Sequence, residues 1–180
     1  RSLNKALAIQ KSVLGENHPY TARSYGNIGS VYSERNDYDK ALEYYNKALA
    51  VLKSVLGENH PDVATCYNNF GNVYQKKGDY DKALEYHNKA LPIWKSVFGE
   101  NHPYLAESYS NIGKVYQNKG DYDTALEYHN KALAVRKFVL GENHPNVASS
   151  YYSIGDDYFA QKNYEKALEY YNKALSIREE

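Results

Sequence analysis

The chain has 180 residues and a formal net charge of zero, because 22 Lys and Arg balance 22 Asp and Glu. A neutral chain has no surplus of basic residues for a nucleic-acid backbone or an anionic lipid surface, so we expect neither partner. The longest apolar run is five residues, 48–52, whereas roughly 20 are needed to cross a bilayer, so we expect no membrane insertion. The single Cys66 cannot form an internal disulfide, which is typical of a cytoplasmic protein.

One unit of 42 residues is repeated along the chain. Its clearest marker, the pentapeptide Gly-Glu-Asn-His-Pro, begins at Gly15, Gly57, Gly99 and Gly141. A fixed period of this length is the signature of stacked repeats, so we interpret residues 1–180 as a single array. Because the chain has no methionine and begins within a unit, we interpret it as a segment of a longer array. Its parts are the second helix of a truncated repeat with its loop, residues 1–18, and four helix pairs, residues 19–60, 61–102, 103–144 and 145–180.

Each unit contains two predicted helices, as the second unit illustrates. Small and apolar residues recur every three or four positions from Ala64 to Tyr74, which places them on one helical face. Gly78 is suited to the left-handed turn that ends this helix, and Asp79 to the cap of the next. In chain order, the pattern predicts a helix over 1–14 and then pairs over 19–35 and 37–56, 61–77 and 79–98, 103–119 and 121–140, and 145–161 and 163–178.

Four histidines, one in each loop, raise the question of a metal site. They are His18, His60, His102 and His144, each directly before a proline. Neighbouring helices in a stack lie roughly 8–10 Å apart, whereas zinc ligands all lie about 2.0–2.3 Å from one ion. We therefore expect no metal site, and a capping or turn role for these histidines.

No group of residues forms a catalytic pattern. Cys66 stands where the other units have Ser24, Ser108 and Ser150, so its position accepts any small, weakly polar residue. A nucleophile needs a base and an orienting group, whereas near-identical units repeat one constellation. We therefore expect no enzymatic activity and no cofactor.

Tyrosine is unusually frequent, with 21 residues against four Phe and one Trp. The tyrosines recur at helical spacing, which favours packing between helices with the hydroxyl groups at the edge. His87 and His129 alternate with Tyr45 and Tyr171 at one position of the unit, so we expect them to pack as aromatic residues do. A base-stacking surface would need interleaved Lys or Arg, and the sequence pattern does not indicate any.

The spacing of the recurring residues resembles that of the tetratricopeptide repeat. In the second unit it is carried by Tyr67, Phe70, Gly71, Tyr74, Gly78, Tyr80, Ala83, His87, Ala90 and Leu91. The extension over 95–98 and the pair Asn68 and Asn69 are similar to the 42-residue repeats of kinesin light chains. The resemblance implies an all-α fold, an α-solenoid in which antiparallel helix pairs form a right-handed superhelix. Asn36 and Lys162 stand at the inter-helix glycine position, where lysine should cost on the order of 1 kcal/mol.

In that family the first helices line a concave groove that holds an extended or short helical peptide. Carried over by resemblance, the peptide-binding residues are Asn27, Asn68, Asn69, Asn72, Lys76, Asn111, Lys114 and Asn118. An Asn side chain offers both a donor and an acceptor to a peptide backbone. We therefore expect a protein–protein interaction scaffold with a protein or peptide partner.

A second interpretation stays open. The similarity of the units also fits a near-consensus or engineered array whose behaviour is purely structural stacking, without a specific ligand. Repeat arrays usually need polar terminal caps, and the apolar ends of this chain lead us to expect head-to-tail self-association.

Overall fold

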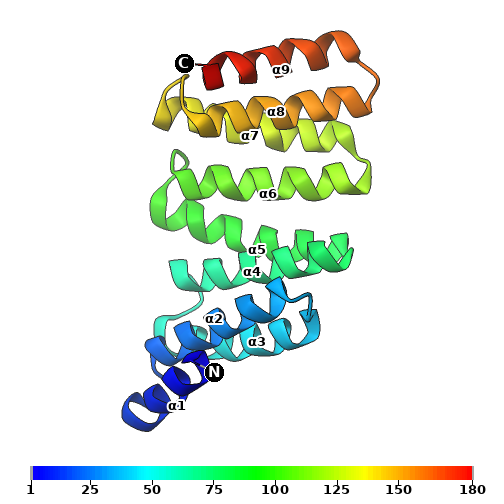
Figure 1. Ribbon diagram of the computed structural model, residues 1–180. Coiled ribbons are helices and arrows are strands. Elements are labelled where there is room, and N and C mark those ends of the chain that lie inside the picture. Colours follow the sequence, from blue (N-terminus) through cyan, green and yellow to red (C-terminus); the bar gives the residue numbers. More distant parts are fainter. Residues whose placement is uncertain (1, 180) are drawn as a thin grey trace. The chain divides into compact units, whose positions relative to one another are not determined.

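The computed structural model describes the backbone of residues 2–179 and the side chains of residues 2–177. Within that part of the chain it contains nine α-helices and no strand (Figure 1). The helices form two compact units, residues 1–97 with α1 to α4 and nearly all of α5, and residues 98–180 with α6 to α9. Their bounds are α1 (Ser2–Leu14), α2 (Pro19–Glu34), α3 (Tyr38–Leu56), α4 (Pro61–Lys77), α5 (Tyr80–Phe98), α6 (Pro103–Lys119), α7 (Tyr122–Leu140), α8 (Pro145–Ala160) and α9 (Tyr164–Glu179).

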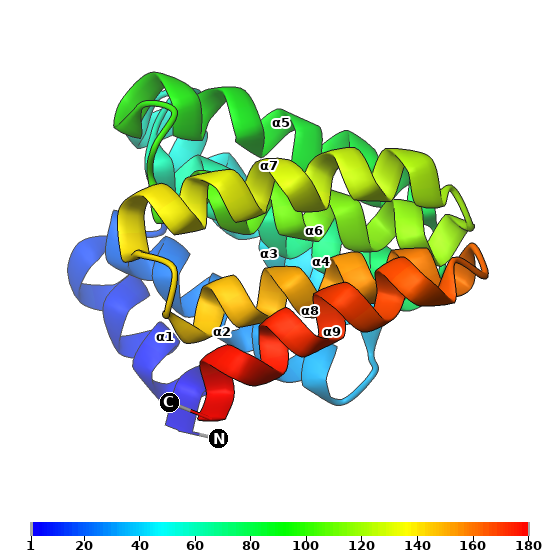
Figure 2. The ribbon, with the colours of Figure 1, turned by 90° about the horizontal axis from the view of Figure 1, so that it is seen from above.

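Within each unit, helices that follow one another in the chain pack together. Helix α2 packs on α3 in the first unit, and α6 on α7 and α8 on α9 in the second. Figure 2 shows α8 and α9 running side by side in opposite directions. The observed bounds lie within a residue or two of the predicted ones, so the all-α architecture of helix pairs is confirmed.

The histidine of each loop caps a helix. The N-cap residues of α2, α4, α6 and α8 are His18, His60, His102 and His144, and each is followed by proline. Each Nδ1 accepts a hydrogen bond from the backbone N–H two residues later, at 3.0–3.1 Å. Because the first N–H groups of a helix have no partner within it, this bond satisfies one of them. The predicted capping role is confirmed.

A left-handed residue ends the first helix of each pair. Gly78 and Gly120 hold this position after α4 and α6, with φ of 82° and 85°. Asn36 and Lys162 hold it after α2 and α8, with φ of 62° and 64°. Asp79 then accepts a backbone N–H of α5 at 3.3 Å, as predicted. The side chain of lysine makes this conformation costly, since its Cβ crowds the backbone.

The two helices of a pair meet where a glycine faces an aromatic ring. A Cβ added to Gly71 of α4 would lie 2.6 Å from the His87 ring of α5. A contact this close leaves no room for any side chain at position 71 of the first helix. Equivalent contacts, at 2.5–2.8 Å, join Gly29 to Tyr45, Gly113 to His129 and Gly155 to Tyr171. The prediction that His87 and His129 pack as aromatic residues is therefore confirmed.

Lysines lie over the tyrosine rings, so the expectation that no basic residues accompany the tyrosines is wrong. Lys53 of α3 and Lys89 of α5 lie 5.5 and 5.8 Å from the centroid of the Tyr67 ring. The two lysines belong to successive repeats, so Tyr67 joins them. Each exposed cation–π contact contributes about 0.5–1 kcal/mol. The Tyr67 ring is thus already covered by the protein's own lysines.

The strained turn before α9 yields a test. We expect Lys162→Gly to raise the free energy of unfolding by about 1 kcal/mol, because glycine adopts positive φ without strain. Urea denaturation at fixed pH measures the change. As a control, Ala160→Gly lies in the preceding helical turn, where glycine should lower stability by a similar amount. Equal destabilisation by both variants would contradict the strain argument.

Candidate functional site

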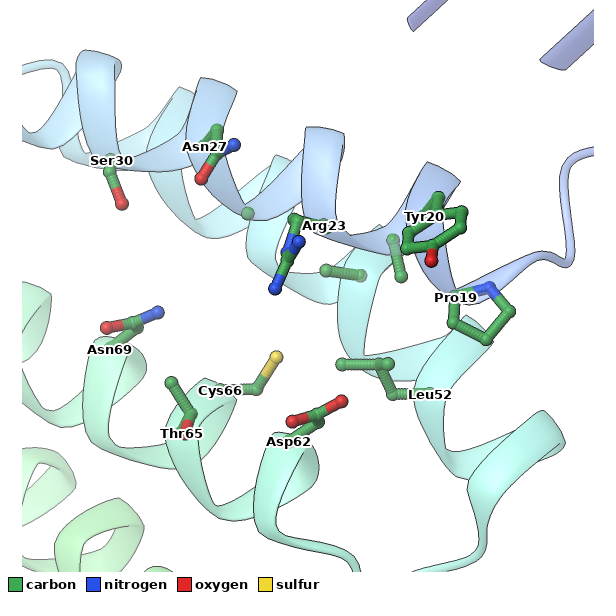
Figure 3. Close-up of a pocket in the computed structure, with 13 residues that line it drawn as sticks. Pro19, Tyr20, Arg23, Asn27, Ser30, Leu52, Asp62, Thr65, Cys66 and Asn69 are labelled. Atoms are coloured by element: carbon green, nitrogen blue, oxygen red, sulfur yellow. The ribbon is translucent and has the colours of Figure 1, made fainter. Parts of the chain in front are cut away.

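A cavity of about 340 Å³ opens between α2 and α4, and all its lining residues belong to the first unit (Figure 3). Side chains of α2 and α4 form its walls. Ala48 and Leu52 of α3 and Cys66 of α4 are buried and form an apolar floor. The cavity therefore combines a polar opening with an apolar base, as ligand pockets commonly do.

Two of the predicted peptide-binding residues line this cavity. Asn27 lies on α2 and Asn69 on α4, and Figure 3 shows them on opposite walls. Asn27 is exposed and Asn69 is half-buried. Both carboxamides can therefore donate and accept hydrogen bonds at the cavity.

Asn68 contacts the second helix of its own pair. Its Oδ1 lies 3.2 Å from Nδ1 of His87. His87 is fully buried, and burial lowers its pKa to about 4, so the ring is neutral near neutral pH. Because the amide oxygen can only accept, the His87 Nδ1–H donates to it. The Asn68 oxygen is thus used inside the helix pair, which the sequence pattern did not predict.

The other predicted residues of α4 are exposed, and one of them is paired. Asn72 is exposed. Lys76 Nζ lies 3.4 Å from Ser33 Oγ and 3.7 Å from Glu34 Oε1, both on α2. An exposed ion pair contributes at most about 1 kcal/mol. Lys76 therefore links neighbouring repeats, and its charge is already compensated.

Three predicted residues lie on α6 in the second unit. Asn111 is half-buried, whereas Lys114 and Asn118 are exposed. Among the eight predicted residues, the structure thus brings Asn27 and Asn69 together at one cavity. The other six lie on α4 and α6, the first helices of the second and third repeats.

A buried polar network joins α6, α7 and α8 and was not predicted. The Asp157 carboxylate is fully buried; its Oδ1 accepts a hydrogen bond from Gln117 at 2.8 Å, and its Oδ2 lies 2.6 Å from His129 Nδ1. Asp157 stands where the other units have Val31, Val73 and Val115. A carboxylate at a valine position was the available signal, since a buried charge needs partners.

The Cys66 thiol at the cavity floor is not a reactive nucleophile. Burial raises the pKa of Cys66 to about 12, so the thiol stays protonated and is a poor nucleophile. Within the described residues, no group of three or more His, Cys, Asp or Glu could hold a metal ion. None of the helices that the structure describes is long and apolar enough to span a membrane.

Comparison with known proteins gives consistent matches. A family model described as Tetratricopeptide repeat matches residues 1–54, 37–96, 67–137 and 104–180. BtubC (BKLC) from P. vanneervenii has a TM-score of 0.87 and 27% identity, over 98% of this chain and 70% of that one. A putative kinesin light chain of Podosopora anserina has a TM-score of 0.81 and 22% identity, over 98% and 83%. The apo form of RapI has a TM-score of 0.81 and 24% identity, over 97% and 62%. Curated proteins give no match.

The buried His87 predicts a pH dependence of stability. Its pKa is lowered in the folded state, so the unfolded chain binds the proton first, and stability falls as pH drops below about 6.5 towards 4. Between about pH 7 and pH 5 we expect His87 to cost about 2 kcal/mol of unfolding free energy. His87→Tyr, which copies Tyr45 and Tyr171, should remove this component. Urea denaturation of both proteins at the two pH values measures it; identical pH profiles would contradict it.

Proposed function

Because the chain belongs to the tetratricopeptide repeat family, we propose that it is a protein–protein interaction scaffold whose first helices bind an extended or short helical peptide. In this proposal residues 1–180 form one array. The observation that carries the proposal is the open cavity between α2 and α4, with Asn27 and Asn69 on its opposite walls. The remaining contact residues in this proposal are Asn68, Asn72, Lys76, Asn111, Lys114 and Asn118.

Asparagine side chains suit recognition of a peptide main chain. An extended backbone presents N–H and C=O groups alternately, and a carboxamide can bond either. Each such bond contributes about 0.5–1.5 kcal/mol net, and ordering the peptide opposes the sum. We therefore expect weak binding, with a Kd of about 1 µM or above, that tolerates changes in peptide sequence. Since the Asn68 oxygen already bonds His87, Asn68 would contribute mainly through its NH2 group.

A second candidate function is self-association through the two ends, and exposed apolar residues favour it. Leu168 and Leu175 of α9 are 62% and 54% exposed, whereas Leu84 and Leu133, at the same two positions of the unit, are each 9% exposed. On α1, Ile9 is 64% exposed. A contact between unlike ends would propagate as a head-to-tail chain.

The compartment is also part of the proposal. Cys66 is the single cysteine and is buried in the reduced form. Proteins without disulfides are typical of reducing compartments. We therefore propose a cytoplasmic location, which fluorescence microscopy of a tagged chain can test.

The groove is tested by removing its two facing amides. Against a peptide selected from a random library on the whole chain, Asn27→Ala with Asn69→Ala should weaken binding about tenfold, because up to four hydrogen bonds are lost. Isothermal titration measures the affinity, and thermal unfolding should change little. The matched control, Asn17→Ala with Asn59→Ala, alters exposed loop amides of the same unit and should leave affinity unchanged. If the control weakens binding instead, the loops and not the groove hold the peptide.

Self-association is tested at the C-terminal helix. Wild-type protein should sediment as larger species at rising concentration, and Leu168→Lys with Leu175→Lys should remain monomeric because the apolar face is lost. The control, Lys166→Glu, is an exposed change on the same helix and should self-associate as the wild type does. A wild-type chain that stays monomeric at about 1 mM would exclude this candidate.

A further inference from the structure

The cavity in the first unit owes its space to one position of the repeat. In two other repeats that position holds a longer polar residue, Gln10 or Arg136, which reaches the next helix, and in the remaining repeat it holds Trp94. Gln10 accepts a hydrogen bond from the Ser24 hydroxyl, and Arg136 Nη1 donates to Ser150 Oγ at 2.8 Å. At the cavity the same two positions are Leu52 and Cys66, which cannot form such a bond. The space that the Gln10 and Arg136 bridges cross in their repeats is therefore left open here, above an apolar floor.

Two opposite charges line this cavity without neutralising each other. Arg23 projects from α2, and Asp62 from α4, on facing walls (Figure 3). Within the described residues, the Arg23 guanidinium has no hydrogen bond or ion pair. The Asp62 carboxylate lies 3.9 Å from His60 Nδ1, but that nitrogen accepts the Asp62 backbone N–H and so carries no proton. Both charges thus remain available to a ligand.

This charge pattern occurs at one place among the cavity-type positions of the chain. The residues equivalent to Arg23 are Thr65, Glu107 and Ser149, and those equivalent to Asp62 are Tyr20, Tyr104 and Asn146. The pairing of a cation on one helix with an anion on the next is therefore specific to the α2 and α4 walls. A general property of the repeat would appear in the other units as well.

From these observations we propose that the cavity binds a free α-amino acid with an apolar side chain. A guanidinium binds a carboxylate through two parallel hydrogen bonds, and a carboxylate attracts an ammonium group. The α-amino acid head carries both ligand charges on one carbon, and its side chain would lie over Leu52 and Cys66. A closed apolar cavity of about 150 Å³ already admits benzene, so about 340 Å³ is sufficient for one such molecule. Asn27 and Asn69 can bond the remaining donors and acceptors of the head.

This inference does not depend on the proposed peptide function. The amino acid would occupy part of the same face, so it should compete with any peptide that contacts Asn27 and Asn69. The site could nevertheless exist in a chain that binds no peptide. Small molecules, and not peptides, are therefore the ligands that test it.

The test titrates L-leucine into the whole chain and follows the backbone amide signals of the cavity by NMR. We expect a Kd of about 0.1–1 mM, as for a small ligand with few contacts. L-leucinamide lacks the carboxylate, 4-methylpentanoate lacks the ammonium group, and glycine lacks the side chain. Each should bind about tenfold more weakly or not at all. Equal binding of leucine and leucinamide, or no shift with leucine at about 10 mM, would overturn the proposal.

Variants locate the site. Arg23→Gln should weaken L-leucine about tenfold while leaving leucinamide unchanged, because the carboxylate partner alone is lost. Leu52→Arg copies Arg136 and should fill the cavity, so that L-leucine no longer binds. Circular dichroism shows whether this variant is folded. Arg35→Gln, an exposed change after α2, is the matched control and should bind leucine as the wild type does. If leucine fails while a peptide still binds through Asn27 and Asn69, this inference falls and the proposed function stands.

Discussion

The contact between a glycine of the first helix and an aromatic ring of the second sets how closely each helix pair approaches. Because glycine has no side chain, the ring packs directly against the backbone of the first helix. The polar end of the ring can then reach a side chain of that helix. Tyr45 reaches the Ser30 hydroxyl at 2.9 Å, whereas the shorter His87 bonds Asn68 at 3.2 Å. In these two pairs Tyr and His therefore bond different residues of the first helix, whereas His129 bonds Asp157 of α8 in the next repeat. The Asn68 side chain of the candidate groove is thus held by the buried His87.

Between repeats, cohesion comes from several modest contacts and not from one large interface. Lysines of two successive second helices, Lys53 and Lys89, both lie over the Tyr67 ring. Lys76 connects α4 to α2. In the second unit, the buried Asp157 replaces this surface pairing with a network inside the core. Such a network is costly to break, because removal of one partner leaves a charge without compensation.

The fold could be predicted from the sequence because its determinants are local. Histidine before proline, aspartate after the inter-helix turn and the period of 42 residues each fix a helix boundary without reference to distant residues. The site could be predicted less well, since it depends on where long side chains end. Whether Asn68 faces a ligand or His87, and whether Lys76 is free or paired, depends on residues 19 and more than 40 positions away. For Asp157, the sequence shows an acidic residue at a valine position of the repeat, but it does not show that Gln117 and His129 are its partners.

The loop that starts each first helix has a consequence for how such a chain can grow. Its glycine ends one helix at positive φ, its histidine caps the next, and its proline occupies the first helical position, all within five residues. None of these interactions requires a side chain from another repeat. A duplicated segment of 42 residues therefore brings its own helix boundaries with it, and the gene can lengthen by unequal crossing-over without first evolving a new joint.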